Sequence, residues 1–387
     1  MEIQEFRLVS IPLVSAIMIL TEIIKNKIEK NGPISFRDFM DMCLYYPSLG
    51  YYTSKNEKIG SSGDFYTAPL LNAAFGHLIG KQLEEMWVLL GKIPMKIIEY
   101  GAGTGLLCQD ILSYLKGNND LYKNLDYCII DKNGWSQKNI REDVSKKISW
   151  YSCIQDIGPF KGCVISNELI DNFAIHRVVM KRRLKEVFVN YKNGFKEILR
   201  PASAVLQTYL KELNVTLPVG FHTEINLQAK EWLKEVADHL QQGFVITFDY
   251  GLLSEELYNA CRMEGTARCY YKHTMHNNFY INPGRQDITS HVNFSALSHY
   301  GYKYGLENCG YSSQNLFLRA LGIIEYIRIA EKAKGCVTTI NSQAGANIKQ
   351  LLLGMGQCIK VLIQKKGLAA QYITGMTFSQ KIPGSFA

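Results

Sequence analysis

The stretch IIEYGAGTGLLCQDIL, residues 97–112, constrains the fold more than any other part of the chain. Its first letters form an apolar run that predicts a buried strand, and the letters after the last glycine have the spacing of an amphipathic helix. Gly101, Gly103 and Gly105 lie between the two, at every second position. A strand followed by a glycine turn and a helix is the unit that binds a nucleotide-like ligand at the carboxyl edge of a parallel sheet.

Strands and helices are expected to alternate on both sides of this unit. The segments that predict strands are 96–100, 126–131, 148–153, 163–167 and 243–251, and those that predict helices begin near residue 106 and cover 71–90, 137–147 and 227–241. Such alternation is the signature of a parallel, doubly wound sheet. The fold class that we expect is therefore α/β with a Rossmann-like sheet. The apolar segment 359–367 is interpreted as a last edge strand.

Two insertions interrupt the alternation. Residues 176–226 contain RVVMKRRLKEVFVNYKNGFKEIL, which predicts antiparallel strands with a hairpin turn at Asn193 and Gly194. Residues 252–292 hold a long loop that is too polar for a core and too aromatic for a linker, and loops of this length in a compact domain are usually functional. We expect the core to cover residues 91–387, with both insertions forming a loop-rich substrate lobe.

The N-terminal part is expected to be helical over residues 18–90, with a glycine-rich loop in it. Residues 8–20 are apolar but lack the basic flank and the cleavage site of a signal peptide, and they are too short to cross a bilayer. Met18 begins a segment with helical spacing that ends at Gly32. Residues 1–17 are therefore interpreted as an upstream extension of the reading frame, which the intact mass of the native protein would test.

The glycine turn does not match the dinucleotide fingerprint. That fingerprint, G-x-G-x-x-G, requires its third glycine at position 106, where this chain has Leu106. The pattern present, E-x-G-x-G-x-G from Glu99, resembles the first motif of class I methyltransferases that use S-adenosylmethionine. Asp131 closes the second strand, where an acid can accept hydrogen bonds from both ribose hydroxyls. On the turn alone, a nicotinamide cofactor or a purely structural turn stays an alternative.

Six further motifs make the resemblance specific. In chain order they are YYPSLGYY, GSSGDFYTAP, SNELIDNFAIHRV, FDYG, GTARCY and NPGRQDITSHVNFSAL. With them the chain resembles, from about Met18 to Lys366, the MidA-like family of S-adenosylmethionine-dependent methyltransferases, which includes a mitochondrial complex I assembly factor. The resemblance implies a class I methyltransferase fold, S-adenosylmethionine as the cofactor and, for the mitochondrial member, symmetric dimethylation of an arginine on a complex I subunit.

Three positions depart from the family pattern. Leu70 stands where the family has an acid, Ala174 replaces a usual proline, and Asp131 takes the place of a usual glutamate. These departures bear on the shape of the cofactor pocket and on the substrate, and they do not affect the expected fold.

The polar residues of SNELID indicate the chemistry. Asn167, Glu168 and Asp171 follow a core strand, so they are expected at the sheet edge where the reactive methyl group should lie. Methyl transfer depends on position and electrostatics, and carboxylates match the planar donors of a guanidinium. We therefore expect Glu168 and Asp171 to hold and orient an arginine while Asn167 shapes the cofactor side. The alternative is that Asn167 or Asp171 caps a helix and Glu168 is a surface acid.

Other site residues are expected around these acids. In GSSGDF, Gly63 permits close approach and Asp64 is available to a cofactor hydroxyl or ammonium, or it orders its own turn. The expected cofactor-binding residues are Gly63, Asp64, Glu99, Gly101, Gly103, Gly105 and Asp131. The expected substrate-facing residues are Arg268, Tyr270, His273, Gln286 and Asp287, for which ordinary loop packing is an equal alternative.

Composition and charge limit the partners only weakly. The formal net charge is +8, and the densest basic cluster, at 181–185, is interpreted as a solvated turn because no aromatic platform accompanies it. The 10 cysteines include no C-x-x-C pair, which indicates free thiols in a reducing compartment. His273 and His276 lack further ligands at metal spacing, so no metal site is expected.

The function predicted from the sequence is that of an S-adenosylmethionine-dependent enzyme that methylates arginine on a protein, with a respiratory-complex subunit as a candidate. We expect a bacterial cytoplasmic location rather than the mitochondrial matrix, without nucleic acid binding or membrane insertion. The apolar helix near residues 316–329 is compatible with a dimer. Two alternatives stay open: a non-catalytic assembly factor that retains cofactor binding, and a small-molecule or carboxyl methyltransferase, which would need a general base or a neutral pocket.

Overall fold

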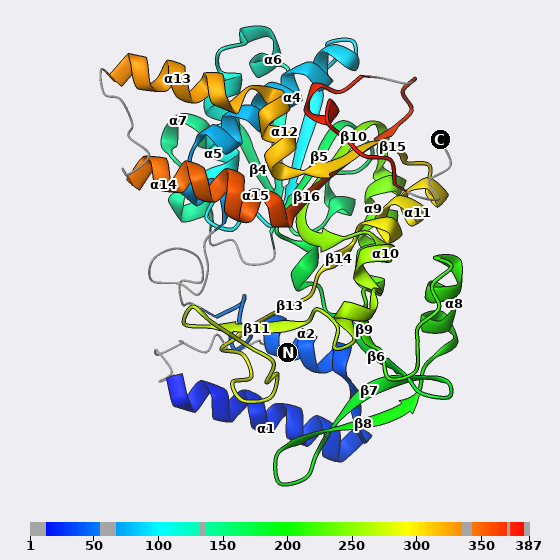
Figure 1. Ribbon diagram of the computed structural model, residues 1–387. Helices are drawn as coiled ribbons and strands as arrows, with labels where there is room; N and C mark the ends of the chain where they lie inside the picture. Colours follow the sequence, from blue (N-terminus) through cyan, green and yellow to red (C-terminus); the bar gives the residue numbers. More distant parts are fainter. Residues whose placement is uncertain (1–12, 55–66, 132–135, 335–342, 370–371, 383–387) are drawn as a thin grey trace.

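The computed structural model describes residues 13–54, 67–131, 136–334, 343–369 and 372–382 (Figure 1). Its largest sheet has the strand order β15-β16-β10-β5-β2-β3-β4, with β14 (Val292–Asn293) pairing beside β10. The strands that run parallel are β2 (Met95–Tyr100), β3 (Leu125–Ile130), β4 (Ile148–Tyr151), β5 (Phe160–Asn167) and β10 (Leu240–Leu252). The predicted α/β class with a doubly wound sheet is confirmed.

The strand near the C-terminus lies inside the sheet, so its prediction as an edge strand is wrong. β16 (Ile359–Lys366) pairs antiparallel with β10 on one side and with β15 (Glu307–Ser313) on the other. Val361, Leu362 and Ile363 are fully buried, as expected for a strand that is covered on both faces. The edge is β15, whose letters ENCGYSS show neither apolar alternation nor a β-branched run, so patterning did not predict it.

Helices cover both faces of this sheet. On one face lie α4 (Ala74–Leu89), α5 (Leu106–Leu115) and α12 (Gln314–Leu321), and on the other lie α9 (Leu227–His239) and α11 (Phe294–Lys303). Successive strand residues point to opposite layers, so Ile97 belongs to the first apolar core and Ile98 to the second. The carboxyl ends of the parallel strands stay clear of both layers and face the rest of the molecule (Figure 1).

Two predicted helices are interrupted. The helix expected over 137–147 consists of a 3-10 turn, Ser136–Asn139, and one turn of α-helix, α7 (Glu142–Ser145). The apolar helix expected after β15 ends at Gly322, whose φ of 94° forms a left-handed cap, and α13 (Ile323–Lys334) follows. Among the described residues, no helix has both the length and the apolar character that crossing a membrane requires.

A second group of elements, which we call the lobe, lies below the sheet in Figure 1. It consists of α1 (Leu13–Asn31), β1 (Ile34–Ser35), α2 (Phe36–Tyr45), β6 (His176–Met180), β7 (Leu184–Tyr191), β8 (Phe195–Pro201), β9 (His222–Ile225), β11 (Arg268–Tyr271), β12 (Thr274–His276) and β13 (Asp287–Thr289). A third apolar core is formed by residues of α1, β1, α2, β7, β11 and β13, and Phe195 of β8 packs against it. Val178 of β6 and Ile225 of β9 belong instead to the second core, under the sheet. The N-terminal helices α1 and α2 therefore pack against the two insertions, while α4 packs against the sheet.

Two sequence predictions within the lobe have clear outcomes. The hairpin between β7 and β8 turns at Asn193 and Gly194, both with positive φ, as predicted. The first helix begins at Leu13 rather than at Met18, and residues 1–12 of the expected extension lie outside the described part of the chain.

An arginine clamp joins the parts of the lobe. The guanidinium of Arg177 lies 4.9 Å from the ring centre of Phe36 and 4.6 Å from that of Phe279. It also pairs with the carboxylate of Glu197. Because the cation contacts two ring faces and an acid, it fixes β6 against α2, β8 and the loop before β13. These contacts hold these elements of the lobe together.

Candidate active site

A cavity of about 1180 Å³ opens between the carboxyl ends of the sheet strands and the lobe. The sheet contributes the turn after β2 and the segments after β3 and β5, and the lobe contributes parts of α2, β11 and β13. A pocket for one drug-sized ligand measures about 300–1,000 Å³. The cavity therefore has room for a cofactor together with the end of a second molecule.

The glycine turn after β2 forms one wall of the cavity. Gly101, Gly103 and Gly105 have φ angles of 69°, 54° and 78°, which residues with a Cβ adopt only with strain. The N–H of Gly101 donates to the carbonyl of Ile130 over 2.9 Å, which fixes the turn to β3. A Cβ on Gly101 would lie 2.9 Å from Cδ1 of Leu169. The bare backbone of Gly101 and Gly103 lines the cavity, so a ligand can approach it closely.

Two acids stand beside this turn. Glu99 is 2% exposed, and its Oε2 accepts a 2.7 Å hydrogen bond from the hydroxyl of Tyr127. Burial raises the pKa of Glu99 to about 7, although this hydrogen bond acts in the opposite direction. Asp131 directly follows β3 and lines the cavity. The other two expected cofactor residues, Gly63 and Asp64, lie outside the described part of the chain.

Glu168 follows β5 directly and has a strained backbone. Its φ of 49° is in the left-handed region, which costs a residue with a side chain about 1–3 kcal/mol. Its carboxylate lines the cavity and accepts hydrogen bonds from the N–H of Ala68 over 3.2 Å and from Nδ2 of Asn167 over 3.3 Å. Burial is the main cause that raises the pKa of Glu168 to about 8. Strained residues cluster at functional sites, which makes Glu168 a candidate for a direct role.

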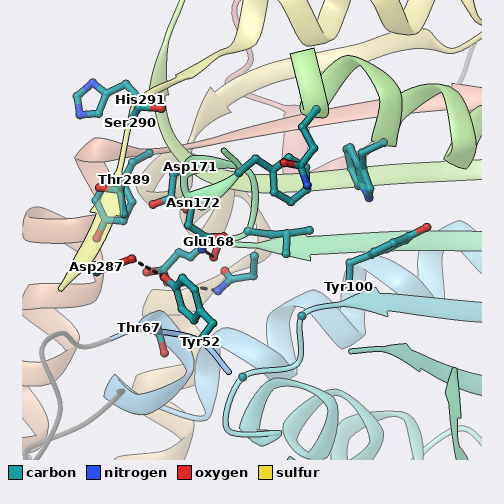
Figure 2. A pocket seen from close by; sticks show the side chains of 18 of the residues that line it. Tyr52, Thr67, Tyr100, Glu168, Asp171, Asn172, Asp287, Thr289, Ser290 and His291 are labelled. Atoms are coloured by element: carbon teal, nitrogen blue, oxygen red, sulfur yellow. Dashed lines mark hydrogen bonds between the residues drawn. The ribbon is translucent and has the colours of Figure 1, made fainter. Parts of the chain in front are cut away.

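Glu168, Asp171 and Asp287 gather at one end of the cavity, and we call them the carboxylate cluster (Figure 2). Asp171 is 7% exposed, and its Oδ1 has no hydrogen-bond partner among the described residues. Burial, followed by the charges of Asp249, Asp287 and Glu168, raises the pKa of Asp171 well above its ordinary value. Because these acids repel one another in their ionised forms, a cation bound between them would be stabilised.

Two tyrosines that sequence reasoning did not single out complete this end of the cavity. The rings of Tyr45 and Tyr52 are stacked, with their centroids 5.6 Å apart. The hydroxyl of Tyr52 donates to Oδ1 of Asp287 over 2.9 Å, and that of Tyr45 donates to Oδ1 of Asn172 over 2.8 Å. Both tyrosines belong to the motif YYPSLGYY, but with 23 tyrosines in the chain the motif alone gave neither of them a role.

The expected substrate wall is only partly assembled at this cavity. Arg268, Tyr270 and Asp287 line it. His273 lies exposed in the turn between β11 and β12, outside the lining residues, with a φ of 59°. Gln286 is fully buried and also outside the lining; its Nε2 donates to the carbonyl of Asn278 over 3.0 Å, so it orders the loop before β13.

Glu224, a residue of β9, holds the segment that leads into Arg268. Its carboxylate accepts hydrogen bonds from the N–H of Thr266 and of Ala267, at 3.0 Å and 3.1 Å, and from the hydroxyl of Thr266 at 3.0 Å. Gly265 lets the chain pass closely, because a Cβ there would lie 2.3 Å from Oε1 of Glu224. This contact accounts for the glycine in the motif GTARCY, which sequence reasoning noted without a partner.

Comparison with known proteins fits this arrangement. Residues 78–312 match the model of the family Methyltransf_28, whose description is "Putative S-adenosyl-L-methionine-dependent methyltransferase". The chain belongs to this methyltransferase family. Its cofactor is therefore S-adenosylmethionine, and the sheet is of the class I type that was expected from the sequence.

Relatives of this methyltransferase include proteins named protein arginine methyltransferases. It is 28% identical over 343 residues to the mitochondrial protein arginine methyltransferase NDUFAF7 homolog of Caenorhabditis elegans, covering 80% of this chain and 78% of that protein. It is 24% identical over 329 residues to the Homo sapiens protein arginine methyltransferase NDUFAF7, covering 77% and 72%. A protein from Burkholderia thailandensis, solved with bound S-adenosyl-homocysteine, superposes with a TM-score of 0.85 at 26% identity, covering 97% and 98%.

The structure shows where two of the departures from the family pattern, Leu70 and Ala174, lie relative to the cavity. Leu70 lies in the short helix α3 (Ala68–Leu71) and is not among the residues that line the cavity. The N–H of Ala174 donates to Oε1 of Gln228 over 3.2 Å, and Gln228 lines the cavity. A proline at position 174 has no N–H, so the alanine allows a hydrogen bond that the usual residue cannot make.

Proposed function

We propose that this methyltransferase transfers a methyl group to the guanidinium of an arginine on a protein. The observation that supports this most is the carboxylate cluster, in which Glu168, Asp171 and Asp287 line the same cavity as the glycine turn. Within the part of the chain that the structure describes, Oδ1 of Asp171 is buried without a partner, so an acceptor is available for a donor brought by a ligand. The relatives named protein arginine methyltransferases support the same substrate class.

The residues that hold the cofactor are proposed to be those of the glycine turn and its neighbours. Gly101 and Gly103 offer backbone that lines the cavity. Gly105, which was expected to bind the cofactor, is buried outside the lining, and its left-handed backbone begins α5, so its part is to shape the turn. Asp131 lines the cavity, and we assign to it the hydrogen bonds with the ribose hydroxyls. Glu99 fixes the end of β2 through Tyr127. Gly63 and Asp64 are retained as cofactor residues on the resemblance alone. When bound, S-adenosylmethionine supplies an electrophilic methyl group.

The carboxylates have two tasks in this proposal. The ionised forms of Glu168 and Asp171 accept hydrogen bonds from the guanidinium and aim one nitrogen toward the cofactor side, which Asn167 shapes. The methylated nitrogen must also lose a proton. Glu168 is suited to accept it, because its pKa of about 8 lies near neutral pH. Arg268 and Tyr270 form the outer wall, whereas His273 and Gln286 are left out of the proposed site because they do not line the cavity.

Labelled methyl transfer tests this function. The protein and S-adenosylmethionine with a labelled methyl group are added to lysate of the source organism, and labelled proteins are separated by size and hydrolysed in acid. We expect methylated arginine from a discrete protein band. A matched Glu168→Gln variant, shown by calorimetry to bind S-adenosylhomocysteine, should transfer less than a hundredth as much label. Label in carboxyl groups or in small molecules, or equal transfer by the variant, would contradict the proposal.

The finer expectations depend on the resemblance. A subunit of respiratory complex I is the candidate substrate, and the cytoplasm is the expected location if the source is bacterial. Identification of the labelled band by mass spectrometry tests the first expectation, and fractionation of the source cells tests the second. A labelled protein unrelated to respiration would leave the arginine chemistry intact and exclude the assembly role.

A further inference from the structure

A buried carboxylate outside the cavity holds the turn that follows β5. Asp249, a residue of β10, is fully buried and is not among the residues that line the cavity. Its Oδ2 accepts hydrogen bonds from three successive backbone N–H groups: those of Leu169 at 3.2 Å, Ile170 at 2.7 Å and Asp171 at 3.4 Å. One side chain thus satisfies three successive amides of the turn.

The sheet register explains why these amides need a side-chain acceptor. Asn167 is the last residue of β5 that pairs with β10, opposite Phe248. The N–H of Glu168 still donates to the carbonyl of Phe248 over 2.9 Å, but the chain then leaves the sheet and the next amides lose their backbone partners. Asp249 follows Phe248 in β10, and its carboxylate accepts hydrogen bonds from these amides in place of a backbone carbonyl. Buried amides without a partner would otherwise destabilise the turn.

The same contact stabilises the unusual backbone of Glu168. This residue has a φ of 49° and directly precedes the three amides that Asp249 holds. A left-handed residue other than glycine persists only where its surroundings fix the chain on both sides. β5 fixes the chain before Glu168 and the Asp249 carboxylate fixes it afterwards. The direction of both catalytic candidates, Glu168 and Asp171, therefore depends on one buried acid.

We propose that Asp249 is a positioning residue for methyl transfer, whose carboxylate holds the turn from Glu168 to Asp171 in the form that directs both acids into the cavity. This inference rests on the proposed function, in which those two acids hold the substrate. A carboxylate is required because both of its oxygens accept hydrogen bonds. Oδ1 accepts from the N–H of Tyr250 over 2.8 Å, while Oδ2 accepts from the three amides of the turn. An amide of the same shape has one acceptor and must present a donor to one side.

The experiment compares Asp249→Asn with the wild type in steady-state kinetics and in binding of S-adenosylhomocysteine. We expect kcat to fall at least tenfold, because small displacements of reacting groups have large effects on rate. We expect the Kd for S-adenosylhomocysteine to change less than twofold, since the glycine turn and Asp131 make none of these contacts. The matched control is Thr247→Val, which removes a buried hydroxyl from the same face of β10 without touching the turn and should keep kcat.

The outcomes separate this inference from the proposed function. Full kcat in Asp249→Asn beside an inactive Glu168→Gln would overturn the positioning role and leave the function standing. Full activity in both variants would overturn the function itself. Parallel losses of kcat and of cofactor affinity in Asp249→Asn would reduce Asp249 to a general stabilising residue and overturn the inference. Asp249→Ser keeps one acceptor and leaves space for water. If Asp249→Asn does not fold, kcat and the Kd for S-adenosylhomocysteine are compared in Asp249→Ser instead.

Discussion

At the scale of single residues, the protonation of Glu168 links the site to pH. Its pKa is about 8 in the free protein, so at neutral pH the carboxylate that should bind a guanidinium is mostly protonated. The quantity kcat/KM reports ionisations of the free enzyme. We expect it to rise about tenfold or more from pH 6 to pH 8.5 and to level off above this range, measured with labelled cofactor and one protein substrate. A profile that is flat or falls over this interval would contradict the role of Glu168.

The same pKa makes a prediction about stability. Because burial raises the pKa of Glu168 above its ordinary value of 4.5, the folded protein retains a proton that the unfolded chain has released. The contribution of Glu168 to the free energy of unfolding therefore decreases as pH rises from about 4.5 to about 8. Glu168→Gln should unfold at the same temperature as the wild type at pH 5 and at a temperature roughly 5 °C higher at pH 8.5. Thermal unfolding without ligands checks this, and a variant that is less stable at both pH values would refute it.

Glu224 provides a prediction about the substrate wall. Glu224→Gln leaves one acceptor for three donors and brings an amide N–H against backbone N–H groups, so the segment before Arg268 should loosen. We expect KM for the protein substrate to rise about fivefold or more, with kcat at saturation and the Kd for S-adenosylhomocysteine within about twofold of the wild type. Glu186→Gln, which neutralises a buried acid of the lobe away from this segment, is the control. A loss confined to kcat would show that Glu224 acts elsewhere.

Sequence reasoning proposed polar residues at the end of a strand and did not single out residues whose contacts depend on the sheet register. Asn167, Glu168 and Asp171 could be proposed because they lie at the end of a recognisable buried strand or within four residues of it. Asp249 was not given a role, since its partner amide at Asp171 is 78 positions away and only the sheet register brings the two together. His273 and Gln286 were expected at the wall because their loop is rich in polar and aromatic residues. Which of those side chains face the cavity depends on the pairing of β11 with β12 and β13.

At the scale of elements, the glycine turn is expected to act on the cofactor rather than on folding. Gly101→Ala places a Cβ at a φ of 69° and within 2.9 Å of Leu169, which should cost about 1–2 kcal/mol of stability. We expect the Kd for S-adenosylhomocysteine, measured by calorimetry, to rise at least tenfold. Gly91→Ala is the matched control, because Gly91 has a φ of 80° and open space around it. Equal affinities of the two variants would show that the turn does not contact the cofactor.

Strands and turns could be predicted where a short stretch of sequence carries the signal by itself. The core strands and the hairpin turn at Asn193 and Gly194 carry their own signals, namely apolar runs and a turn dipeptide. The position of β16 was not predictable in this way, because an apolar run shows that a strand is buried and does not show which strands lie beside it. β15 was missed because its letters carry no strand pattern and its place in the sheet comes from pairing with β16, which lies far along the sequence.

At the scale of the whole molecule, the cavity joins the sheet to the lobe, so ligand binding should stabilise both. S-adenosylhomocysteine at about one hundred times its Kd should raise the free energy of unfolding by about 2.7 kcal/mol. We expect slower hydrogen exchange in the glycine turn, and in β11 and β13 once an arginine peptide is added as well. NAD at the same concentration should have no effect. Stabilisation by NAD, or protection limited to surface helices, would contradict the assignment of this cavity to the cofactor and substrate.

The interior position of β16 also determines when the chain can finish folding. Residues 359–366 lie near the end of the sequence, yet they form the strand that joins β10 to β15. A ribosome must therefore have made every residue before Ile359 before β10 and β15 can pair with β16. Until then β10 has an unpaired apolar edge, the kind of edge on which nascent chains associate with one another. Premature termination upstream of β16 would leave a sheet that cannot close, even though every cofactor and substrate residue named above had already been translated.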